Sequence, residues 1–97
     1  MNSKPLTVAV VGATGVVGGT MIRMLQERRF PIGKLLLLAS ARSAGQAVDV
    51  NGTEHIVREA TAEAFDGVDI ALFSAGGDTS KALAPLAAQR GATVIDN

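Results

Sequence analysis

One stretch near the start of this chain decides its fold. Residues 8–18 read Val8-Ala9-Val10-Val11-Gly12-Ala13-Thr14-Gly15-Val16-Val17-Gly18. A short apolar run leads into a Gly-x-x-Gly-x-x-Gly turn, and a helical pattern follows. In such a turn Gly12 permits a tight exit from the strand, Gly15 lets phosphates approach the backbone, and Gly18 lets the helix pack closely. Because a helix N-terminus presents free N–H groups, the stretch predicts a pyrophosphate site; the alternative is a glycine turn without a ligand.

Outward from this stretch, strand and helix patterns alternate along the whole chain. Alternation of this kind predicts an α/β fold of the Rossmann type, with a doubly wound, mostly parallel sheet and a β-hairpin insertion. Pro85 inside the second helical pattern predicts a late helix start or a kink. We expect strands at 6–11, 34–39, 68–74 and 92–97, helices at 15–29 and 80–90, a hairpin of 46–50 with 54–58, and a helical turn at 61–65.

Composition limits the class of protein. The 97 residues allow one small domain, and their 47% hydrophobic content with 11 glycines fits strands buried on both faces, or a piece of a larger protein. Nine basic and nine acidic residues cancel, which argues against nucleic acid or anionic lipid as a partner. The absence of cysteine excludes disulfides and thiolate metal sites, and His55 has no clustered ligands, so we expect a cytoplasmic protein without a metal.

The end of the second predicted strand indicates which dinucleotide binds. NAD-binding domains carry an acidic residue there, which holds the ribose hydroxyls. This chain instead has Arg42 between Ser40 and Ser43, with no acid in residues 38–43. A guanidinium forms charge-assisted contacts with phosphate, and serines add donors. The segment therefore favours NADP, whose 2′-phosphate needs such partners; the alternative is a solvated loop arginine.

Two further segments follow strands at the edge where ligands of open α/β sheets bind. Residues 74–77 read Ser74-Ala75-Gly76-Gly77, and their glycines would let a dinucleotide pass close to the backbone. An ordinary tight connection into the next helix explains them equally well. Asp96 and Asn97 end the next strand and are candidates for substrate contact.

With these residues in view, the chain resembles the N-terminal segment of the aspartate-semialdehyde dehydrogenases. Four stretches carry the resemblance, and together they follow the family's order over nearly the whole chain. They are residues 11–18 (VGATGVVG), 39–45 (ASARSAG), 71–77 (ALFSAGG) and 94–97 (VIDN).

The resemblance implies a cofactor site and a reaction. Thr14, Gly15, Val16 and Val17 would cradle the NADP pyrophosphate beside Gly12; Arg42, Ser43 and Ser40 would bind the 2′-phosphate; and Ser74, Ala75, Gly76 and Gly77 would line the cofactor further along. Enzymes of this family are oxidoreductases that reduce β-aspartyl phosphate to aspartate semialdehyde, releasing phosphate, on the route to lysine, methionine and threonine. The resemblance also implies a homodimer or larger assembly for the whole enzyme.

The chain departs from the family where catalysis is concerned. The family uses a cysteine nucleophile, and this chain has no cysteine. We therefore expect a truncated NADP-binding domain over residues 1–97, with the catalytic and dimerisation domain absent and no catalytic residue in this chain, so that it does not catalyse alone. Two alternatives are an N-acetylglutamyl-phosphate reductase and a non-catalytic NADP sensor related to short-chain reductases. Residues 40–43 and 96–97 favour the aspartyl enzyme over the first of these.

Overall fold

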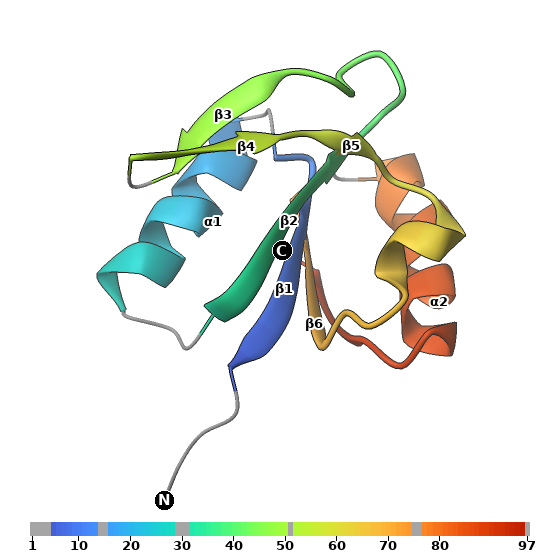
Figure 1. Cartoon of the computed structure of the whole chain (residues 1–97). Helices are drawn as coiled ribbons and strands as arrows, with labels where there is room; N and C mark the ends of the chain where they lie inside the picture. The colour runs from blue at the N-terminus through green and yellow to red at the C-terminus, as the bar shows by residue number, and fades with distance from the viewer. Residues whose placement is uncertain (1–4, 14–15, 29–31, 51, 75–76, 97) are drawn as a thin grey trace, which may run out of the picture.

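The computed structural model describes residues 5–13, 16–28, 32–50, 52–74 and 77–96. A five-stranded sheet lies at the centre, with one helix on each face and a hairpin along one side (Figure 1). Every pairing within this sheet is parallel, in the order β5-β2-β1-β6-β7. The strands are β1 Leu6–Val11, β2 Ile32–Ala39, β5 Arg58–Glu59, β6 Ile70–Phe73 and β7 Thr93–Asp96.

This strand order contains a reversal between β1 and β6. The chain moves outward from β1 to β2 and β5, then returns to place β6 on the other side of β1 and continues to β7. In open α/β sheets the crevice at such a reversal, at the carboxyl ends of the strands, is where ligands bind. The predicted Rossmann-type fold is confirmed.

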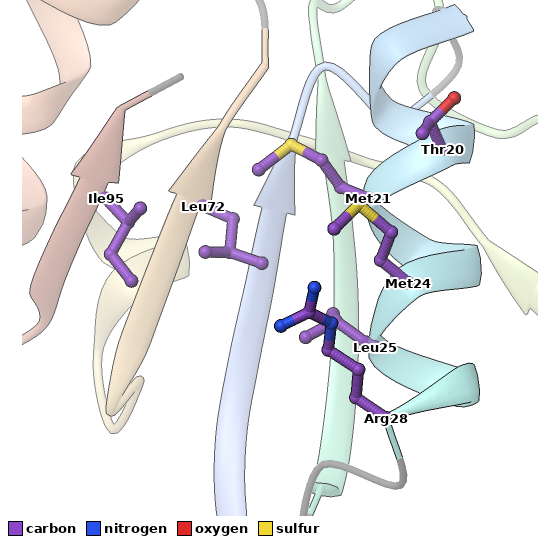
Figure 2. A pocket seen from close by; sticks show the side chains of 7 residues that line it. All are labelled: Thr20, Met21, Met24, Leu25, Arg28, Leu72 and Ile95. Atoms are coloured by element: carbon purple, nitrogen blue, oxygen red, sulfur yellow. The ribbon is translucent and has the colours of Figure 1, made fainter.

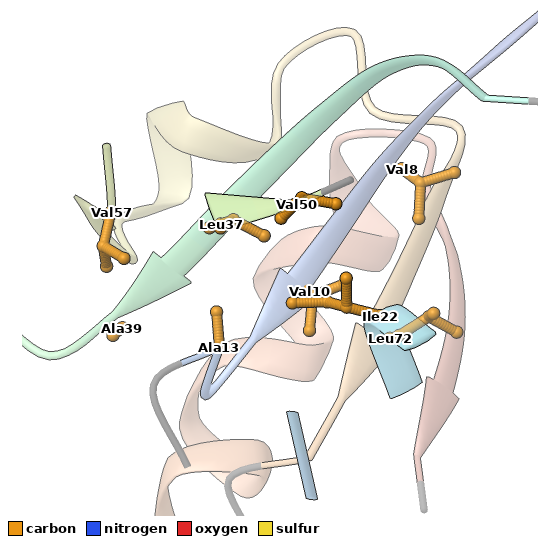
Figure 3. Close-up of a cluster of buried hydrophobic side chains, with 9 residues drawn as sticks. All are labelled: Val8, Val10, Ala13, Ile22, Leu37, Ala39, Val50, Val57 and Leu72. Atoms are coloured by element: carbon orange, nitrogen blue, oxygen red, sulfur yellow. The ribbon is translucent and has the colours of Figure 1, made fainter. Parts of the chain in front are cut away.

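The apolar run of β1 is buried on both faces of the sheet. Val8, Ala9, Val10 and Val11 are all 0% exposed. Because successive side chains of a strand point to opposite faces, Val8 and Val10 join a cluster on the α1 side, whereas Ala9 and Val11 join a cluster on the α2 side. Figure 3 shows the first cluster, in which Ile22 of α1 packs near Val10 and Leu72.

The two helices cover opposite faces. Helix α1 spans Val16–Glu27, two residues shorter at its C-terminal end than predicted, and α2 spans Gly77–Gln89. Of the two alternatives predicted for Pro85, a late helix start or a kink, the late start is wrong, because α2 begins three residues before Ser80 and includes Pro85. Pro85 and Lys81 both lie on the exposed side of α2, where water can satisfy the Lys81 carbonyl that Pro85 cannot bond.

The C-terminal end of α2 is closed as predicted. Gly91 has a φ of 92°, its N–H donates to the Ala88 carbonyl at 3.0 Å, and the Ala92 N–H donates to the Ala87 carbonyl at 3.1 Å. This pair of hydrogen bonds is a Schellman motif, which satisfies carbonyls at the helix end.

The predicted hairpin forms, but its second strand is shorter than expected. Strands β3 Ala47–Val50 and β4 Thr53–Ile56 pair antiparallel as a separate two-stranded sheet. Arg58, predicted within the hairpin, instead begins β5 and pairs parallel with Leu38. Val57 causes the break, because its side chain is only 1% exposed and its backbone bonds to Gly45 and Gln46. The hairpin thus occupies the crossover between β2 and β5, where a helix is usual.

The bounds of strands β2 and β6 also differ from the prediction. Strand β2 begins at Ile32 rather than Lys34, because Ile32 pairs with Leu6 of β1. Strand β6 spans four residues of the seven predicted for 68–74. The helical turn predicted at 61–65 is a 3-10 helix, η1, over Ala62–Phe65, and the Thr61 hydroxyl caps it by accepting from the Ala64 N–H at 3.3 Å.

Candidate dinucleotide-binding site

The glycine turn leaves β1 in a conformation that favours glycine. Gly12 has a φ of 89°, which L side chains rarely adopt. The Leu38 carbonyl at the end of β2 accepts from the Gly12 N–H at 2.8 Å and from the Ala13 N–H at 3.3 Å. The start of the turn is therefore bonded to the neighbouring strand. Thr14 and Gly15, both predicted to bind the pyrophosphate, lie outside the described residues.

Helix α1 lies directly against this turn. A β-carbon built on Gly18 would lie 2.3 Å from the Gly12 carbonyl oxygen and 2.9 Å from the Ala13 α-carbon. Only glycine permits so close an approach, as the spacing of the motif predicts. Because α1 begins at Val16, the backbone of Val16 and Val17 forms the first turn of the helix, where N–H groups have no partner within the helix.

Ser74 connects the end of β6 to the same turn. Its backbone N–H donates to the Val11 carbonyl at 2.9 Å. Its hydroxyl lies 2.9 Å from the Val11 carbonyl oxygen and 3.2 Å from that of Gly12, and it donates to them. The predicted site residue Ser74 therefore lies beside the predicted site residue Gly12. Ala75 and Gly76 are outside the described residues, and Gly77 begins α2.

Arg42 lies in a turn that follows β2. The Ser40 carbonyl accepts from the N–H groups of Ser43, at 3.0 Å, and Ala44, at 3.1 Å. The side chains of Ser40 and Arg42 are exposed, and Ser43 is half-buried. No carboxylate among the described residues pairs with Arg42. Its guanidinium is thus available to an anion from solvent.

The parallel sheet brings these segments to one edge. Strands β2, β1 and β6 are neighbours and run in the same direction, so the turns after Ala39, Val11 and Phe73 leave the sheet at the same end. Asp96 ends β7 at this edge too, opposite Phe73. Asn97 lies outside the described residues. The turn geometry, the close approach of α1 and the free guanidinium fit a phosphate-rich ligand such as a dinucleotide.

A separate apolar groove was not predicted from the sequence. It has a volume of about 450 Å³ and runs alongside α1 over β6 and β7 (Figure 2). The Met24 side chain, on the apolar side of α1, is 44% exposed and lines this groove. The reason is that α1 covers β1 and β2 and leaves this part of the sheet open. The residues lining it are Thr20, Met21, Met24, Leu25, Arg28, Leu72 and Ile95, and none is a predicted cofactor residue.

The described part of the chain contains no group of three or more His, Cys, Asp or Glu side chains placed to hold a metal ion. It also contains no helix long and apolar enough to cross a membrane. Its one ion pair joins Arg90 to Asp66 at 2.6 Å, far along the chain from the glycine turn. That contact raises the pKa of Arg90, because the Asp66 carboxylate accepts a hydrogen bond from the guanidinium and attracts its charge.

Comparison with known proteins identifies the domain. The family model described as "Semialdehyde dehydrogenase, NAD binding domain" matches residues 7–97. Aspartate-semialdehyde dehydrogenase of Bacillus subtilis (strain 168) is 59% identical over 94 residues, which are 97% of this chain and 27% of that protein. The chain thus spans a little over a quarter of the length of this curated relative.

Solved structures give the same result. Aspartate semialdehyde dehydrogenase II of Vibrio cholerae, crystallised in complex with ASA, is 51% identical with a TM-score of 0.88, covering 97% of this chain and 31% of that one. A probable aspartate-semialdehyde dehydrogenase from Pseudomonas aeruginosa is 44% identical with a TM-score of 0.90, covering 96% of this chain and 28% of that one. The domain described by the family model binds a nicotinamide dinucleotide. This chain belongs to the semialdehyde dehydrogenase family, as its NAD-binding domain.

Proposed function

We propose that this chain is the NADP-binding domain of an aspartate-semialdehyde dehydrogenase. The whole enzyme would reduce β-aspartyl phosphate to aspartate semialdehyde and release inorganic phosphate. Support comes from the relatives, which are named for this activity and cover nearly all of the chain. The domain's part in the reaction is to bind the dinucleotide at the strand-order reversal and to present its nicotinamide toward substrate.

The glycine turn is the proposed binding site of the pyrophosphate. The segment 14–17 would present backbone N–H groups to the phosphates, and the positive end of the α1 dipole would favour their charge. Gly12, whose own N–H is bonded to Leu38, would let the chain turn beside them. Residues 74–77 would line the cofactor further along, since they leave the strand next to β1 at the same edge.

Arg42 carries the choice of NADP over NAD. It lies exposed in the turn after β2, without a carboxylate partner among the described residues, and no acidic residue ends that strand. A ribose hydroxyl pair needs an acceptor at this position, whereas a 2′-phosphate needs a cation. Ser40 and Ser43 on either side add hydroxyls that can donate to the same phosphate. The exposed Arg42, together with the lack of an acidic residue at the end of β2, is the observation that best distinguishes NADP from NAD as the cofactor.

Isothermal titration with NADP and NAD tests the choice. Arg42→Ala should weaken NADP binding by about 1.5–3 kcal/mol, the range of a charge-assisted hydrogen bond, and leave NAD binding nearly unchanged. Arg23→Ala is the matched control, because Arg23 is also an exposed arginine but lies within α1. Equal losses for the two cofactors in Arg42→Ala would contradict the assignment.

A chimera tests the activity. Residues of this chain that align with the Bacillus subtilis relative would replace the matched 94 residues of that enzyme. We expect the chimera to reduce NADP in the presence of aspartate semialdehyde and phosphate, and to lose NADP affinity when Arg42→Ala is added. A folded chimera that binds NADP but shows no turnover with this substrate would argue against the proposed reaction.

A further inference from the structure

The hydroxyl of Ser74 faces the backbone of the glycine turn. Its oxygen lies 2.9 Å from the Val11 carbonyl oxygen and 3.2 Å from the Gly12 carbonyl oxygen. A serine hydroxyl has one hydrogen to donate, so these two carbonyls share its whole donor capacity. What Ser74 still offers a ligand is lone pairs, which suit a donor and not the oxygens of a phosphate.

The Gly12 carbonyl that Ser74 contacts is also the point where α1 touches the turn. The same oxygen would lie 2.3 Å from a β-carbon on Gly18. On the other side, the Gly12 N–H is bonded to the Leu38 carbonyl of β2 at 2.8 Å. The peptide groups around Gly12 are therefore held by β2, by α1 and by Ser74, which directly follows β6.

We propose that Ser74 is a positioning residue for the glycine turn: its hydroxyl holds the carbonyls of Val11 and Gly12 and thereby orients the turn whose backbone N–H groups receive the pyrophosphate. This inference rests on the proposed dinucleotide site, which residues 74–77 were expected to line. Gly12 has a φ of 89° and no side chain to restrict it, so hydrogen bonds from outside the turn keep one peptide orientation. Leu38 bonds the N–H side of this turn, and Ser74 bonds its carbonyl side. A preorganised set of donors binds phosphate more tightly because less ordering remains to be done on binding.

Two ligand fragments separate this role from general support of the fold. ADP-ribose carries the pyrophosphate but no 2′-phosphate, and adenosine 2′-monophosphate carries the 2′-phosphate but no pyrophosphate. In Ser74→Ala the affinity for ADP-ribose should fall about three- to tenfold, the fold-change that one hydrogen bond contributes, and the affinity for adenosine 2′-monophosphate should stay within twofold. Arg42→Ala is the matched control and should show the opposite pattern.

The titrations are made on the whole chain, below the melting temperature of each variant as determined by circular dichroism. If Ser74→Ala does not fold, Ser74→Cys replaces it, because a thiol fills nearly the same space with a weaker donor and should show the same split. Unchanged ADP-ribose affinity in a folded variant would overturn the inference, and so would equal losses for the two fragments. Failure of the wild-type chain to bind either fragment would instead count against the proposed function.

Discussion

Gly18 of α1 lies so close to Gly12 that a β-carbon on Gly18 would be 2.3 Å from the Gly12 carbonyl oxygen. The contacted atom belongs to the backbone of a turn that is already bonded to β2, so it cannot move aside as a flexible side chain would. The position of α1 relative to β1 therefore depends on one missing side chain. Since the first turn of α1 contributes to the proposed phosphate site, the same contact links packing to binding.

Gly18→Ala should therefore both destabilise the domain and weaken dinucleotide binding. We expect a loss of about 1–3 kcal/mol in the free energy of unfolding, typical of overpacking, measured by urea denaturation. Gly19→Ala is the control, because a β-carbon there has nothing within 4 Å. Within a helix alanine is more stable than glycine by about 1 kcal/mol, so this variant should not be destabilised. A Gly18→Ala variant as stable as wild type would show that α1 moves away without cost.

Ser40→Asp should shift cofactor preference toward NAD. Ser40 is exposed directly after β2, where NAD-binding domains carry their acidic residue. A carboxylate there would repel the 2′-phosphate and accept from ribose hydroxyls, so NADP affinity should fall at least about tenfold while NAD affinity holds or rises. Fluorescence titration with the two reduced cofactors measures the ratio, and Ser40→Asn controls for size. A parallel fall for the two cofactors in Ser40→Asp would place the adenine ribose elsewhere.

Phe65→Leu should destabilise the α2 side of the core. The Phe65 side chain is 0% exposed and stacks on Phe73 with ring centroids 6.0 Å apart. We expect a loss of about 1–2 kcal/mol in the free energy of unfolding, from lost ring contacts and a partly filled cavity. Ile56→Ala on the hairpin is the comparison, because Ile56 is 54% exposed and its truncation should cost less. A larger loss for Ile56→Ala than for Phe65→Leu would contradict this account of the core.

The Arg90–Asp66 ion pair should contribute little to stability and should not make stability depend on pH near neutrality. The two side chains are 36% and 61% exposed, so water and salt screen their attraction. Contact with Asp66 raises the pKa of Arg90, so stability gained through Arg90 is lost only as pH rises through that folded-state pKa, far above neutral. The melting temperatures of Arg90→Gln and of wild type should therefore differ by the same small amount at every pH between 6 and 9, in low and high salt alike. A gap between the two melting temperatures that closes with added salt would show a stronger pair.

Local patterns were sufficient for most elements and for the class of ligand. The buried run 8–11, the roles of Gly12 and Gly18 in the turn, and the Gly91 cap each depend on residues close in sequence, and each was confirmed in the structure. The presence of Arg42 after the second strand, where NAD-binding domains carry an acidic residue, is also evident from a few neighbouring residues. These features follow from steric and electrostatic properties of short segments.

Contacts between distant segments required the tertiary structure. Strand β5 is two residues long and has no pattern of its own; it exists because Val57 is buried beside the end of β2. Met24 belongs to the apolar side of α1, yet it lies over a part of the sheet that α1 does not cover. The hydroxyl of Ser74 meets the Gly12 carbonyl only because β6 returns to the far side of β1, 62 residues later in the chain. Sequence by itself determined most of the elements, the glycine turn and the cofactor class, because these depend on local chemistry. The strand order, and with it the partners of each side chain, was decided by which surfaces the folded chain could bury together.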